Sequence, residues 1–168
     1  MPGDRRRVTW LALSLAACLP VGRPSVQLEP GASLSGYRVF DVRPVVDKSG
    51  WPFPYDITDS LRNELAHRLR EHGYTVTTAD STRGGGGGAI LGVESRLTYF
   101  QTGAAVFTLE GGPGGTRCAL TSVLMDAASG RRLGEIAATE QDQGSPFEVL
   151  MSCARVVADE INRRVREK

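Results

Sequence analysis

The sequence predicts an α/β (α+β) domain in which two main helices pack on a mixed sheet of about five strands. Two segments, residues 57–72 and 146–165, carry apolar residues three or four positions apart, which is the spacing of an amphipathic helix. Five other stretches have the composition or alternation of strands. Their order indicates a first β-α-β crossover and then antiparallel strands.

The predicted crossover joins a strand over residues 36–45 to a short strand over residues 74–78 through the helix of residues 57–72. Asp56 or Thr58 is expected to cap the start of this helix, and Gly73 stands where a left-handed cap would end it. One face of the helix is apolar: Ile57, Leu61, Leu65 and Leu69.

The second half of the domain is predicted to be a run of antiparallel strands closed by a helix. Residues 89–100 alternate with period two, and residues 116–125 and 132–139 form a hairpin around the turn 126–130. The glycine run 84–88 is expected to be a loop. Ser145, Pro146 and Glu148 form a capping box before the last helix. Its apolar face is Phe147, Leu150, Ala154, Val157, Ile161 and Val165.

The N-terminus is typical of a bacterial lipoprotein signal peptide over residues 1–17. Residues 1–7 are basic, and the apolar run 8–17 is too short to span a bilayer, which takes roughly 20 helical residues. Residues 15–18, Leu-Ala-Ala-Cys, match a lipobox, which predicts that Cys18 carries diacylglycerol and palmitate-type chains. An ordinary cleaved signal peptide and an uncleaved anchor are the alternatives.

Residues 18–35 are predicted to be a flexible tether, since they are rich in Pro, Gly and Ser, and residues 36–168 a single periplasmic domain. Leu19, rather than an aspartate, follows the predicted lipid site. By resemblance to Gram-negative lipoproteins, this favours the outer membrane, with the domain facing the periplasm. Membrane attachment is expected through the lipid on Cys18.

Charge and motifs exclude several function classes. Removing residues 1–17 leaves 17 basic and 18 acidic residues, a net charge of −1, which gives no drive toward nucleic acid. The two glycine clusters, residues 84–88 and 111–115, lack a following Lys-Ser/Thr pair, so no nucleotide site is predicted. His67 and His72 point about 140° apart on a helix and cannot share a metal. Both are expected to be exposed, and no cofactor is predicted.

Two further residue sets have two readings each. Cys118 and Cys153 remain after lipidation, and they either pair as a disulfide in an oxidising compartment or stay as two small buried thiols. Trp51, Phe53 and Tyr55, stiffened by two prolines, form either a partner surface or a lid on the core. The lid is the favoured interpretation, because exposed apolar clusters are uncommon.

The chain resembles a family of uncharacterised bacterial lipoproteins, a domain-of-unknown-function family. The resemblance rests on Leu61, Leu65 and Leu69 with Gly73-Tyr74-x-Val76, on residues 89–99, and on the hairpin motif of residues 126–131. The same layout resembles the periplasmic domains of the activator LpoB, the secretion lipoprotein CsgG and the N-terminal domain of TolB. The resemblance implies a non-catalytic scaffold or partner-binding domain.

The sequence thus predicts an envelope-anchored lipoprotein that is not an enzyme and that binds another cell-envelope component as scaffold, adaptor or regulator. No catalytic constellation, such as a Gly-x-Ser-x-Gly elbow, is present. The alternative is an envelope hydrolase or transferase whose active site is not recognisable from sequence.

Overall fold

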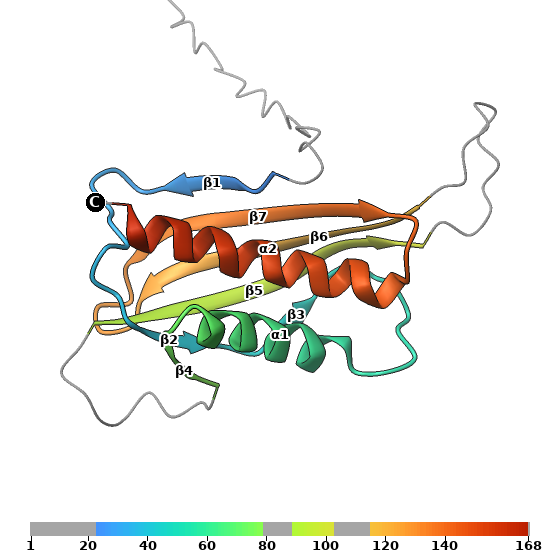
Figure 1. Ribbon diagram of the computed structural model, residues 1–168, viewed down its shortest axis with the longest axis horizontal. Coiled ribbons are helices and arrows are strands. Elements are labelled where there is room, and N and C mark those ends of the chain that lie inside the picture. The colour runs from blue at the N-terminus through green and yellow to red at the C-terminus, as the bar shows by residue number, and fades with distance from the viewer. Residues whose placement is uncertain (1–22, 79–88, 103–114, 168) are drawn as a thin grey trace, which may run out of the picture.

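The domain consists of a seven-stranded mixed sheet with two helices on one of its faces (Figure 1). The computed structural model describes residues 23–78, 89–102 and 115–167. The signal peptide, Cys18 and the glycine run 84–88 therefore lie outside the described residues. The helices are α1 (Ile57–Glu71) and α2 (Pro146–Arg166). The strands are β1 (Ser25–Leu28), β2 (Val39–Val42), β3 (Val46–Asp47), β4 (Thr75–Thr77), β5 (Ile90–Gln101), β6 (Thr116–Asp126) and β7 (Arg132–Asp142).

The strand order is β1-β7-β6-β5-β2-β4, and β3 also pairs with β5. β2 and β4 are parallel and flank α1 in the chain, so the predicted β-α-β crossover is confirmed. β5, β6 and β7 are antiparallel neighbours, as predicted for the second half. The fold class is therefore confirmed, although the sheet has seven strands rather than about five. The added strands, β1 and β3, are short and carry little sequence pattern.

The helices begin and end close to the predicted residues. The side chain of Asp56 accepts hydrogen bonds from the backbone amides of Thr58 (3.0 Å) and Asp59 (3.3 Å), which caps α1. Gly73 follows α1 with φ +88°, a left-handed conformation that glycine adopts without strain. Ser145 stands at the N-cap of α2, but its hydroxyl makes no capping hydrogen bond. The predicted capping box is therefore wrong, and Pro146 in the first turn marks the start.

The core lies between the helices and the covered face of the sheet. Leu65 and Leu69 of α1 and Leu150 and Ile161 of α2 are fully buried. The side chains that meet them from the sheet are also fully or almost fully buried: Phe40, Leu91, Leu97, Leu120, Leu124 and Ile136. The opposite face of the sheet is covered by neither helix (Figure 1).

The first strand corrects the predicted tether. Residues 25–28 pair antiparallel with β7, with Ser25 opposite Ala137 and Leu28 opposite Gly134. Leu34, also within the predicted tether, is 1% exposed. The flexible-tether prediction for residues 18–35 is therefore wrong over the described part from residue 23 on. The Pro-, Gly- and Ser-rich composition favours a tether, but β1 is extended because it pairs with the edge of β7, a strand from the other end of the chain.

Gly134 allows β1 to lie close to β7. A Cβ atom built on Gly134 would be 2.5 Å from the backbone oxygen of Gln27 and 2.7 Å from Cδ2 of Leu28. Both distances are shorter than van der Waals contact, and one partner is backbone, which cannot move aside as a side-chain tip can. Only glycine fits at this position while β1 stays in place.

We expect Gly134→Ala to detach β1 and to lower stability by about 1–3 kcal/mol, the usual cost of overpacking. Hydrogen exchange at the amides of residues 25–28 should become faster, while exchange in β5 and β6 should stay slow. Gly144→Ala is the matched control, because its nearest atom would be at 3.7 Å. Unchanged protection of β1 in Gly134→Ala would contradict the close-approach argument.

Candidate functional site

Aromatic side chains gather at the end of the domain where β5 and β7 finish and both helices begin. We call Trp51, Phe53, Tyr55, Phe100 and Phe147 the aromatic end. Phe100 is the second-last residue of β5. Its ring lies 5.4 Å from that of Trp51 and 4.9 Å from that of Phe53, measured between centroids. Tyr55 and Phe147 form a second pair at 6.4 Å. Chain segments far apart in sequence thus build two aromatic groups at this end of the domain.

The structure divides the Trp-Pro-Phe-Pro-Tyr segment between the two predicted roles. Phe53 is half-buried and packs on the hydrophobic core, as the lid interpretation requires. Trp51 is 36% exposed and Tyr55 49% exposed, so these two rings also form surface. Phe147, predicted on the buried face of the last helix, is 39% exposed, because it lies in the first turn of α2 beside Tyr55. A surface role for Trp51 and Tyr55 stays a prediction.

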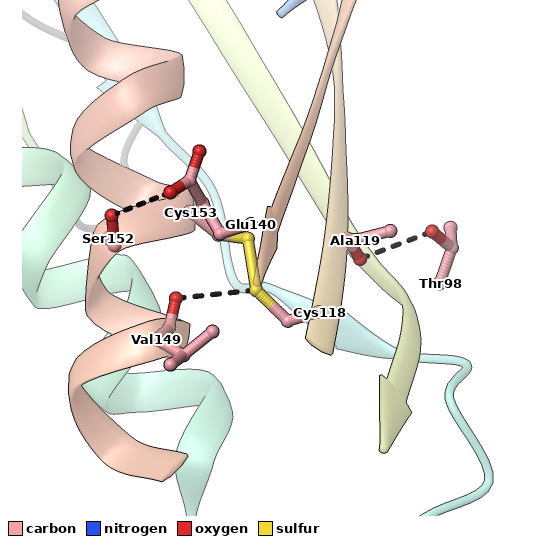
Figure 2. Close-up of a disulfide and its surroundings, with 7 residues drawn as sticks. All are labelled: Thr98, Cys118, Ala119, Glu140, Val149, Ser152 and Cys153. Atoms are coloured by element: carbon pink, nitrogen blue, oxygen red, sulfur yellow. Dashed lines mark hydrogen bonds between the residues drawn. A yellow bond between two sulfur atoms is a disulfide. The ribbon is translucent and has the colours of Figure 1, made fainter. Parts of the chain in front are cut away.

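A disulfide joins the sheet to α2 beside this end. Cys118 in β6 and Cys153 in α2 are bonded, and both residues are fully buried (Figure 2). Of the two possibilities that the sequence left open, the structure therefore shows the paired cysteines. Directly before Cys153 in α2, the hydroxyl of Ser152 donates to the carboxylate of Glu140 at 3.2 Å (Figure 2). The bond fixes the start of α2, and with it Phe147, relative to the ends of the strands.

A polar surface pocket lies between the end of β7 and the first turns of α2. Its lining is Glu140, Gln141, Asp142, Glu148, Val149, Ser152 and Arg155. Arg155 is engaged by two carboxylates, with Nε 2.5 Å from Glu64 and a terminal nitrogen 3.6 Å from Glu148. The hydrogen bond to Glu64 raises the pKa of Arg155. Three carboxylates against one neutralised guanidinium disfavour a phosphate-bearing ligand here.

The two histidines are separate, as their spacing predicts. The side chain of His67 is 65% exposed, but that of His72 is only 18% exposed, with Nε2 2.6 Å from Asp159. The predicted exposure of His72 is therefore wrong, because α2 packs against the end of α1. Although partial burial raises it, hydrogen bonds from Arg68 and His72 hold the pKa of Asp159 below its ordinary value. Within the described residues, no group of three or more His, Cys, Asp or Glu side chains could hold a metal.

One interaction that sequence reasoning missed lies at the opposite end, in the β6–β7 turn. The carboxylate of Asp126 accepts hydrogen bonds from the hydroxyl of Ser129 (2.6 Å) and from that of Tyr37 (2.7 Å). The hydrogen bond from Ser129, followed by that from Tyr37, lowers the pKa of Asp126 to about 2. Burial and the carboxylate together raise the pKa of Tyr37 to about 12. These bonds tie the turn to the segment before β2, a structural role.

Within residues 23–78, 89–102 and 115–167, no helix is long and apolar enough to cross a membrane.

The sequence matches no family model and no curated protein. The fold, however, is similar to that of PelC from Paraburkholderia phytofirmans, which was crystallised as a dodecamer. One PelC structure aligns over 86% of this chain and 99% of PelC, with 16% identity and a TM-score of 0.58. Another covers 80% and 96%, with 16% identity and a TM-score of 0.56.

A hypothetical protein from Chlamydia trachomatis is also similar, at 10% identity and a TM-score of 0.55, over 76% of this chain and 97% of that protein. At these identities the likeness shows the fold alone. The same arrangement of sheet and helices thus occurs in other bacterial proteins, while the predicted likeness to LpoB, CsgG and TolB stays a prediction.

Proposed function

We propose that the protein is a non-catalytic lipoprotein, anchored in the outer membrane through Cys18 and facing the periplasm, that binds another envelope component. The observation that carries the proposal is the lipobox of residues 15–18 at the end of a short apolar run. The Cys118–Cys153 disulfide supports export independently, since such bonds persist in oxidising compartments. Leu19 after the lipid site favours the outer membrane.

The polar interactions support a structural rather than a catalytic role. Arg155 pairs with Glu64, Arg68 with Asp159, and Glu160 with Arg163 and Arg164, so these charges are neutralised within the domain. A general acid or base needs a free side chain near a substrate site, and an ion pair on a helix surface does not supply one. The rival function, an envelope hydrolase or transferase, would need a site outside these clusters.

The uncovered face of the sheet is the partner surface that we propose. On β6 and β7 it presents small, half-buried side chains: Ala119, Thr121, Val123 and Ala137. Thr121 lies opposite Ala137 and Ala119 opposite Thr139, so this face has a low centre on β6 and β7, and the longer side chains of Arg96 and Tyr99 stand beside it on β5. The dodecamer formed by PelC makes a second copy of this chain the first candidate for the partner.

Crosslinking in intact cells, followed by pull-down, tests the proposal. We expect a crosslinked species that contains either further copies of the chain or another envelope protein. Ala137→Arg should abolish it, because a buried guanidinium without a partner disrupts a packed interface. Ala128→Arg, in the exposed β6–β7 turn, is the matched control and should leave it intact.

Two results would overturn the proposal. One is a monomeric protein without any crosslinked partner. The other is turnover of an envelope substrate by the purified protein that Ala137→Arg retains. Circular dichroism of both arginine variants must match that of the parent, so that loss of crosslinking is not loss of fold.

A further inference from the structure

Among the described residues, the exposed aromatic rings lie at one end of the domain. Of the residues that the structure describes, the aromatic side chains with large exposure are Trp51, Tyr55, Tyr99 and Phe147. Tyr99 lies near the end of β5, next to Phe100, and the other three belong to the aromatic end. The opposite end carries the polar β6–β7 turn around Ser129 and Arg131. The two ends of the sheet therefore differ in chemistry.

The chain also enters the domain from the side of the aromatic end. β1 is antiparallel to β7, so β1 begins on the side toward which β7 proceeds to Asp142 (Figure 1). α2 begins shortly after Asp142, with Phe147 in its first turn. Cys18 precedes Ser25 by seven residues. A chain of that length spans at most about 25 Å, so a lipid on Cys18 keeps the bilayer close to the domain.

Tryptophan and tyrosine suit the boundary between lipid and water, because each has an apolar ring and a polar group that prefers to stay hydrated. Pro52 and Pro54 restrict the backbone around Trp51 and Tyr55, which reduces the entropy lost on contact. Two carboxylates stand next to the exposed rings in sequence: Asp56 follows Tyr55, and Glu148 follows Phe147. They favour an uncharged headgroup layer over an anionic one.

We propose that the aromatic end rests in the headgroup region of the bilayer that holds the lipid on Cys18. Trp51, Tyr55 and Phe147 are the contact residues, and the ring of Trp51 packs on Phe100, which in turn packs on Phe53. The inference rests on the proposed function, because the lipid anchor supplies the attachment. It adds an orientation: the ends of β5 and β7 point toward the membrane, and the uncovered face of the sheet stays accessible to a partner.

The sequence provides the probe for a test. It contains two tryptophans, Trp10 and Trp51, so Trp10→Phe leaves Trp51 as the single tryptophan of the full chain. Cys118 and Cys153 are bonded to each other, which leaves Cys18 as the thiol that reacts with a maleimide lipid. The lipid-coupled protein is bound to phosphatidylcholine vesicles that contain brominated chains, and tryptophan quenching is measured. This coupling makes the test independent of lipidation in the cell.

We expect quenching and a blue shift of Trp51 emission on vesicles, both weaker when part of the lipid is phosphatidylglycerol. The matched control combines Trp10→Phe, Trp51→Phe and Ala128→Trp, which moves the single tryptophan to the exposed turn at the opposite end. Its emission should stay unquenched. Equal quenching of the two proteins, or stronger quenching at position 128, would overturn the proposed orientation.

Two further measurements separate this inference from its premise and from a protein partner. Mass spectrometry of Cys18 from cells reports lipidation. A Cys18 without lipid would count against the proposed function but would leave the vesicle result valid. A photo-crosslinking amino acid at Tyr55 in cells should link to lipid. Linkage to an envelope protein instead would overturn the membrane contact and assign the aromatic end to that partner.

Discussion

Cys18→Ser is expected to move the protein from the membrane fraction to the soluble fraction of the envelope. The serine hydroxyl cannot take the thioether-linked diacylglycerol, and the chain without the predicted signal peptide would have a net charge of −1 and no polybasic segment that binds anionic lipid. Burial of acyl chains stabilises membrane attachment by about 0.8 kcal/mol per methylene group, so losing several chains removes almost all of it. Contacts of three aromatic rings would not replace that energy.

Fractionation of cells with immunoblotting measures the shift. Leu19→Asp is the matched control, because it retains the thiol and should stay with membranes while favouring the inner one. If Cys18→Ser still floats with membranes at the level of the parent, the lipid is not the anchor and the reading of residues 15–18 is wrong.

Removing the disulfide is expected to lower the free energy of unfolding by about 3–4 kcal/mol. The bond closes a loop of 35 residues, and the entropy that this loop regains in the unfolded chain gives that magnitude. The double variant Cys118→Ala with Cys153→Ala, made in the Cys18→Ser background to keep the protein soluble, isolates the effect. Urea unfolding followed by circular dichroism should show a lower midpoint.

Reduction provides the control for this prediction. A reductant should lower the midpoint of the parent by a similar amount and leave the double alanine variant unchanged. Since Cys153 is in the first half of α2, local loosening should appear as faster hydrogen exchange around residues 146–153. An unchanged midpoint in the double variant would show that the bond does not constrain the domain in solution.

The helices were predictable because their signals are local. The leucines of residues 57–72 form one helix face regardless of which element packs on it. Asp56 marks the start of the helix by accepting backbone hydrogen bonds, and Gly73 marks its end by adopting a left-handed conformation. The hairpin of β6 and β7 was predictable for the same reason, since the turn residues 126–130 lie between the two strands. Where a short stretch decides its own conformation, the sequence is sufficient.

The elements that were missed depend on distant partners. β1 has four residues in a Pro- and Gly-rich surrounding, and it is a strand because β7 offers an edge with a glycine in the right place. The pairing of Cys118 with Cys153 required knowing that α2 starts over the first residues of β6. Phe147 looked like core because helical periodicity does not tell where the underlying sheet ends.

The docking of β1 on β7 also has a consequence for the order of folding. In the export that we propose, β1 would be the first strand to emerge, and it pairs with the last strand of the sheet, so it must wait until the chain through β7 has emerged. Contacts between such distant segments form late and slowly, because a long loop must close first. We therefore expect the lipid to reach Cys18 while the strand next to it is still unpaired, and the sheet edge at β7 to be the last part of the domain protected from proteases.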